Sequence, residues 1–99
     1  MKRVFEEHIE ITPGICGGKA RIAGRRVRVS DIVIWHERLG MTADEIASAS
    51  DLTLADVHAA LAYYFDHTAE IESEIRESRR VAEELRALTP SKARTKLGA

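Results

Sequence analysis

The chain has 99 residues, of which 44% are hydrophobic and 31% are charged, and its formal net charge is −1. A chain of this length forms one modest domain, which favours a binding module over an enzyme with an elaborate active-site cavity. We therefore expect no catalytic residue. The near-neutral total also argues against indiscriminate coating of nucleic acid, because affinity for phosphates grows with the number of cations presented together.

The cysteine and histidine content excludes an internal disulfide and gives no support for a metal site. Cys16 is the single cysteine. The four histidines fall in different predicted elements, without the spacing of metal ligands: His8, His36, His58 and His67. The N-terminus lacks the apolar run of a secretory signal, and no segment approaches the roughly 20 apolar residues that cross a bilayer. We expect a cytoplasmic protein with no metal, no cofactor and no membrane partner.

The N-terminal part has the patterns of short strands. Residues 4–11 mix β-branched and aromatic residues with charges, and the Thr-Pro-Gly of residues 12–14 ends them with turn chemistry. Apolar and basic residues alternate in residues 20–22 and 27–29, which flank a turn at 23–26. This alternation predicts a small hairpin that packs its apolar face inward and turns its arginines to water.

The predicted hairpin concentrates positive charge. Residues 17–29 hold five cations and no acid, whereas residues 41–85 hold eleven acids against three arginines. We expect these cations to bind nucleic-acid phosphates: Lys19, Arg21, Arg25, Arg26 and Arg28. A purely solvating role for the same charges is an equally open interpretation.

Three helices are predicted between residues 30 and 66. Ser30 is the expected N-cap of a helix over residues 31–39, which Gly40 stops. Thr42 opens a second helix, through about Ser48, with capping-box spacing. The third starts after Thr53 and has a buried stripe at helical spacing, made of Val57, Ala60, Leu61 and Tyr64.

The second and third of these helices fit a helix-turn-helix, since apolar residues stand where the two helices must touch. The fit is incomplete, because residues 42–65 hold four acids and no lysine or arginine. Thr53 is the polar residue near the start of the third helix that we expect to contact DNA, with the basic hairpin gripping phosphates beside it. A bundle that serves only to hold a dimer together is the alternative.

Beyond residue 66 the pattern predicts a long helix with an apolar seam, made of Thr68, Ile71, Ile75, Ser78, Ala82 and Leu85. Such a seam needs a partner. Residues 66–68 are weak helix formers and permit either a bend or straight passage. The predicted organisation is a β element plus helix-turn-helix domain over residues 1–66, the long helix over 67–88 and a flexible basic tail over 89–99. The fold class is mainly α.

The motifs of the hairpin and helices resemble a bacterial family, the domain of unknown function 433. The resemblance covers about residues 5–66 and rests on the Gly-Gly-Lys-Ala-Arg-Ile-Ala-Gly-Arg-Arg-Val-Arg-Val of residues 17–29, followed by Asp31-Ile32, Gly40-Met41-Thr42, Glu45-Ile46, Leu52-Thr53, Asp56-Val57 and Ala60-Leu61. Ala20 and Arg25 depart from the typical pattern of that family, which has proline and threonine there. By position, Lys19, Arg21, Arg26 and Arg28 would belong to the family's basic hairpin.

The resemblance implies a homeodomain-like helix-turn-helix protein and a VapB-type antitoxin. Such a protein would neutralise a PIN-like ribonuclease toxin, bind operator DNA as a homodimer and repress its own operon. We expect the toxin or a second protomer to contact the long helix through Ile71, Ile75, Val81, Leu85 and Leu88. A stand-alone DNA-binding regulator and a protein-interaction module that never touches DNA are the alternatives.

Overall fold

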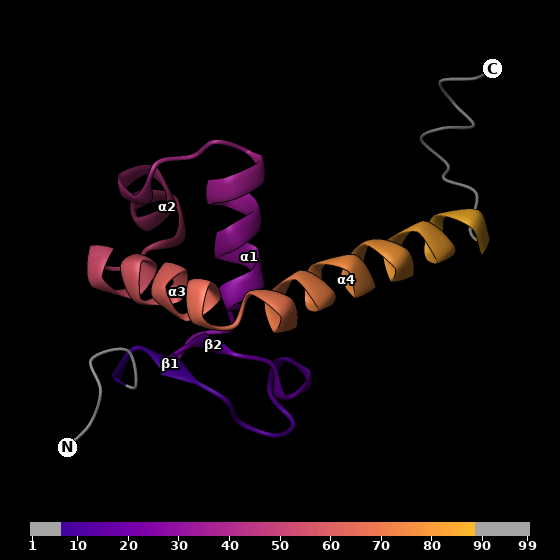
Figure 1. Cartoon of the computed structure of the whole chain (residues 1–99), viewed down its shortest axis with the longest axis horizontal. Helices are drawn as coiled ribbons and strands as arrows, with labels where there is room; N and C mark the ends of the chain where they lie inside the picture. The colour runs from indigo at the N-terminus through magenta and orange to yellow at the C-terminus, as the bar shows by residue number, and fades with distance from the viewer. Residues whose placement is uncertain (1–6, 89–99) are drawn as a thin grey trace.

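The computed structural model describes residues 7–88 and is mainly helical, with a two-stranded antiparallel sheet at its N-terminal end (Figure 1). In chain order the elements are β1 (Ile9–Glu10), the 3-10 turn η2 (Cys16–Gly18), β2 (Arg21–Ile22), α1 (Val29–Val33), the π-helical turn η3 (Ile34–Arg38), α2 (Ala43–Ser50), α3 (Leu54–Asp66) and α4 (Thr68–Leu88). The predicted fold class is confirmed. Part of the predicted first strand and the predicted flexible tail of residues 89–99 lie outside the described residues.

The predicted hairpin forms only in part, because residues 27–29 contribute a single bridge and Val29 begins α1, while the sheet itself pairs β1 with β2. Ile9 lies opposite Ile22 and Glu10 opposite Arg21 in the β1–β2 pair. On its other side Arg21 forms an isolated antiparallel bridge with Arg28, and the Ile22 amide donates to the Val27 carbonyl at 2.8 Å. A β unit this small needs a helical support, and in Figure 1 both strands lie beneath α3.

The first helix begins earlier than predicted. Ser30 is wrong as the N-cap, because it lies within α1 and is buried. The N-cap position belongs to Arg28, whose backbone N–H donates to the Asp31 carboxylate at 3.0 Å. The helical path then widens into η3, where the Leu39 amide bonds the Ile34 carbonyl five residues back.

The caps predicted for the next two helices are confirmed. The Thr42 hydroxyl accepts from the Glu45 amide, and the Glu45 carboxylate accepts from the Thr42 amide. Thr53 and Asp56 repeat this arrangement at the start of α3. Reciprocal bonds of this kind satisfy backbone donors that a helix leaves free in its first turn. Asp51 joins α2 to α3 in the left-handed backbone region, with φ of 55°.

The core sits where α1 meets α3. The predicted stripe of α3 is buried, namely Val57, Ala60, Leu61 and Tyr64, and it packs with the fully buried Ile32 and Val33 of α1. α2 packs against α3 and adds a third helix to this core. These three helices form the body on which the β pair rests (Figure 1).

The long helix is separated from α3 by a bend at His67, which answers the question that residues 66–68 left open. The φ of −134° and ψ of 42° at His67 are not helical. The His67 ring stacks on Tyr63 with centroids 4.0 Å apart, and the Thr68 hydroxyl donates to the Tyr64 carbonyl at 3.1 Å. α4 therefore leaves the body in a new direction (Figure 1).

Only the first half of α4 packs against the body. Ile71 is 0% exposed and Ile75 is 3% exposed, because both side chains belong to the core. The expectation that these two residues contact a toxin or a second protomer is therefore wrong, since their own domain covers them. Of the helices within residues 7–88, none combines the length and apolar character that spanning a membrane requires.

Two truncations on α4 test this division. Replacing Ile71 with Ala should lower the free energy of unfolding by about 2 to 5 kcal/mol, because it leaves a cavity in the core. Replacing Leu85 with Ala removes a similar side chain from an exposed site and should change it by less than about 0.5 kcal/mol. Urea denaturation followed by circular dichroism measures the free energy of unfolding of both variants. Equal losses would contradict the conclusion that only the first half of α4 packs against the body.

Candidate functional site

The five cations of the hairpin do not form one surface. Arg21, Arg25 and Arg26 line a small pocket beside the hairpin turn. Lys19 and Arg28 instead lie toward the first half of α4, near Glu74. The alternating pattern predicted that all five cations face water on one surface. In the structure they form two separate groups.

Arg21 is a structural cation. Its residue is only 5% exposed, which contradicts the prediction that it faces water. One terminal nitrogen donates to the Glu10 carboxylate at 2.9 Å and to the Thr12 hydroxyl at 3.2 Å, and the other donates to the carbonyls of Ile22 and Arg25. The β register explains the ion pair, because it places Glu10 directly opposite Arg21.

Arg25 attaches the hairpin turn to the end of α2. Its two terminal nitrogens donate to the carbonyls of Asp51 and Ser50 at 2.9 and 3.0 Å, where α2 ends. The last carbonyls of a helix have no partner inside it, and a cation there also complements the helix dipole. Arg25 is half-buried, and it meets no carboxylate among residues 7–88.

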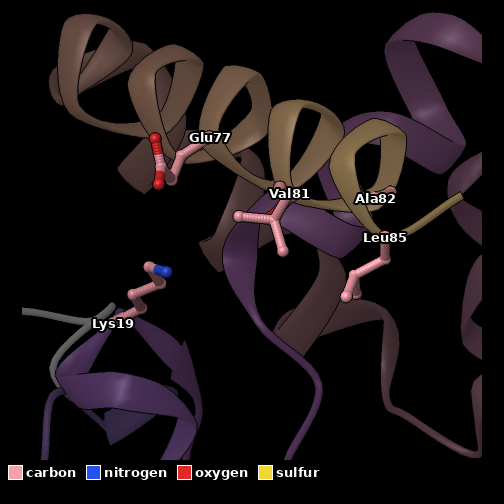
Figure 2. Close-up of a pocket in the computed structure, with 6 residues that line it drawn as sticks. Lys19, Glu77, Val81, Ala82 and Leu85 are labelled. Carbon is pink, nitrogen blue, oxygen red and sulfur yellow. The ribbon is translucent and has the colours of Figure 1, made fainter. Parts of the chain in front are cut away.

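The second group of cations faces acidic residues. Arg28 forms an ion pair with Asp31 at 3.0 Å, and this hydrogen-bonded carboxylate raises the pKa of Arg28. Figure 2 shows Lys19 extending toward Glu77 of α4. Burial, followed by repulsion from Glu70, raises the pKa of Glu74 although Lys19 and Arg28 oppose that shift. Arg28 is therefore neutralised by Asp31 of α1, whereas Lys19 lies near the carboxylates of α4 without forming an ion pair within residues 7–88.

Arg26 is the exposed arginine of the turn. Within residues 7–88 its side chain makes no hydrogen bond and no ion pair, so of the four arginines it alone is fully turned to water as the alternating pattern predicted. Two of the five cations, Arg21 and Arg28, are thus neutralised by carboxylates of the same chain. This weakens the electrostatic case for DNA binding.

The start of α3 has a structural role as well. The Thr53 hydroxyl accepts from the Asp56 amide at 3.0 Å, so this predicted DNA contact is engaged as a helix cap. Asp56 also bonds the His8 ring at 2.9 Å, which ties the N-terminal segment to α3. Burial opposes ionisation of Asp56, but its hydrogen bonds from His8 and Thr53 outweigh this and lower its pKa.

The outer half of α4 carries the largest exposed apolar side chains of that helix. Val81, Leu85 and Leu88 are 40%, 59% and 78% exposed. Figure 2 shows Val81 and Leu85 on the side of α4 that faces the Lys19 loop, across a groove of about 320 Å³. A second groove, of about 400 Å³, lies on the other side of α4 and includes Ile34 and Leu39.

Sequence reasoning missed Glu74 and Leu39. Glu74 lies three residues after Ile71, so helical spacing puts it on the face that packs against the body. Its partial burial could have been predicted from this spacing. Leu39, the last residue of the predicted first helix, follows the π turn and is 66% exposed. Within residues 7–88, no cluster of three or more potential metal ligands occurs.

The capping role of Thr53 can be measured. Replacing Thr53 with Ala should lower the free energy of unfolding by about 1 kcal/mol, because the Asp56 amide loses its acceptor. Replacing it with Ser keeps the hydroxyl and should preserve most of the stability. Thermal denaturation of the two variants distinguishes them, and equal losses would reject the cap as the cause.

The raised pKa of Glu74 predicts that the free energy of unfolding depends on pH. The raised pKa means that ionised Glu74 destabilises the folded state above that pKa, and that the cost disappears below the usual value of 4.5. Its buried Oε1 also has no donor among the described residues. Glu74→Gln should therefore be more stable than the parent at about pH 7.5, with the gap closing near pH 4. Urea midpoints at both pH values test this, with exposed Glu83→Gln as the control; a gap that is independent of pH would contradict it.

Comparison with known proteins places this geometry in a family. A family model described as "Protein of unknown function (DUF433)" matches residues 9–64. None of the curated proteins compared with the chain matches it. The crystal structure of a DUF433 member protein from Anabaena variabilis is 38% identical to the chain, with a TM-score of 0.64, and the match covers 72% of this chain and 70% of that one. The family match runs from β1 into α3 and spans more than half of the chain, and the chain therefore belongs to the DUF433 family.

Proposed function

We propose that this chain is the antitoxin of a type II toxin–antitoxin pair and that the outer half of α4 holds the toxin. The proposal of a PIN-like ribonuclease as the toxin rests on the family resemblance. The observation that carries the proposal of a protein partner is the exposed apolar stripe of Val81, Leu85 and Leu88.

The position of the stripe supports a docking role. A helix of 21 residues is about 31 Å long, and only its first part contacts α1 and α3. Ion pairs from Arg80 to Glu77 and Glu84 support the outer half, but such exposed pairs contribute little to stability. The outer half thus presents apolar area without a core of its own, which suits an amphipathic helix that enters a groove on a partner.

Operator binding is the second candidate, and it is favoured by the packing of α2 against α3 across a short turn, which we interpret as a helix-turn-helix. Three hairpin cations have no carboxylate partner in residues 7–88: Lys19, Arg25 and Arg26. The cations form two groups, and the exposed residues of α3 include no lysine or arginine. A regulator without a toxin and an interaction module without DNA binding remain the alternatives that the experiments below separate.

The toxin-binding proposal predicts a loss of complex formation. The chain is co-expressed with the product of the adjacent gene, and replacing Val81, Leu85 and Leu88 with Ser should abolish co-purification and release growth inhibition. Those three positions project from one face, because they recur at spacings of three and four. An unchanged complex would exclude the stripe, and a neighbouring gene that encodes no nuclease would exclude the antitoxin proposal.

The matched control alters the opposite face of the same helix. Replacing Arg76, Glu83 and Ala87 with Ser changes three exposed positions and should leave the complex intact. Circular dichroism of both variants establishes that α4 remains helical. Light scattering of the free protein shows whether the same stripe also joins two copies.

DNA binding, if present, should depend only moderately on salt. Three unpaired cations in each of two protomers give a slope of log affinity against log salt of about −5, compared with about −9 if all five in each engaged. Fluorescence anisotropy with a duplex from the upstream region measures this slope. If no binding occurs even at low salt, the result would exclude operator binding and favour a protein-interaction module that does not contact DNA.

A further inference from the structure

A pocket beside the hairpin turn concentrates arginine side chains. It has a volume of about 250 Å³ and is lined by Ile15, Arg21, Gly24, Arg25 and Arg26. Ligand pockets for drug-sized molecules begin at about 300 Å³, so this one suits a small group. Among the described residues, Glu10 is the carboxylate that meets these arginines, and it pairs with Arg21. Three guanidinium groups against one carboxylate leave the pocket positively charged.

Arg21, which lines the pocket, has an unused donor. Arg21 carries five N–H groups, and its terminal nitrogens are occupied by Glu10, Thr12 and two backbone carbonyls. Its Nε is buried and has no acceptor within residues 7–88. An unpaired buried donor is costly, and a charged donor more so. Arg21 is therefore held rigidly in place with one hydrogen-bonding group left over.

The wall of the pocket has further donors. Arg25 uses one N–H of each terminal nitrogen to hold the end of α2, which fixes its position and leaves its other N–H groups free. Arg26 has all of its donors available within the described residues and is exposed. The site therefore combines an immobile cation, a partly anchored one and an accessible one. Guanidinium groups suit planar and tetrahedral oxyanions because their donors are arranged in a fixed fork.

We propose that this pocket binds a single phosphate-type oxyanion. Arg21 and Arg25 form the preorganised part of the site, and Arg26 closes on the anion from the solvent side. The phosphate group belongs either to a small molecule or to a nucleic-acid backbone. This proposal concerns a different surface from the α4 stripe, so it stands or fails independently of the toxin.

The test uses inorganic phosphate as the probe. The full chain labelled with ¹⁵N is titrated with sodium phosphate, with sodium chloride at matched ionic strength as the reference. Saturable shifts are expected for the backbone amides of Gly24, Arg25 and Arg26 and for the Nε–H of Arg21. Shifts that stay linear, or that equal those caused by chloride, would overturn the proposal.

Two charge-matched variants locate the site. Arg26→Gln should weaken phosphate binding on the order of tenfold, since a charge-assisted hydrogen bond is lost. Arg86→Gln removes an exposed arginine from the far part of α4 and should leave the affinity unchanged. Equal affinity in the Arg26 variant and the parent would reject the assignment. Both positions are exposed, so neither change should affect folding.

A further arm identifies the source of the phosphate. A short DNA duplex that shifts the same resonances at lower concentration than inorganic phosphate would assign the site to a nucleic-acid backbone. A nucleoside monophosphate that does so, with no effect of the duplex, would assign it to a small molecule. Failure of inorganic phosphate, mononucleotide and duplex alike would overturn the proposal.

Discussion

The burial of Arg21 is the constraint on which the N-terminal half depends. A guanidinium removed from water is tolerated only when a counter-charge and hydrogen-bond acceptors surround it. Here the acceptors come from β1, the loop after it and the hairpin turn, so one side chain fixes three segments relative to each other. Breaking the pair by removing Glu10 alone would leave this cation without its counter-charge.

A second arginine, Arg25, connects the β pair to the helices. Arg25 holds the carbonyls at the end of α2, and its own carbonyl accepts from Arg21. The β pair is too small to be stable alone, but through these bonds it shares the stability of the helical core. The glycine- and arginine-rich segment therefore serves folding first, and any ligand must use the donors that folding leaves free.

Features that depend on spacing within one element could be predicted from the sequence, whereas contacts between distant segments could not. The caps at Thr42 and Thr53 and the buried stripe of α3 follow from spacing within one element. The burial of Arg21 depends on the β register with Glu10, which alternation alone does not specify. In α4 the same seam continues from Ile71 to Leu85, yet only the tertiary fold determines that its first half meets α1 while its second half extends past the body. Spacing within one element therefore assigned Arg21, Ile71 and Ile75 the wrong surroundings, because each is buried by contacts with other parts of the chain.

The π turn at η3 has an effect on how insertions and deletions act in this chain. A π-helical turn is closed by a hydrogen bond between residues five apart, whereas an α-helical turn joins residues four apart. The segment Ile34–Arg38 therefore contains one residue more than a regular α-helical turn would. Deleting one position there would restore regular helix and rotate Arg38 by about 100° around the axis. Arg38 would then lose Glu72, the partner through which η3 braces the base of α4. A change of one codon would thereby remove the ion pair that joins η3 to α4.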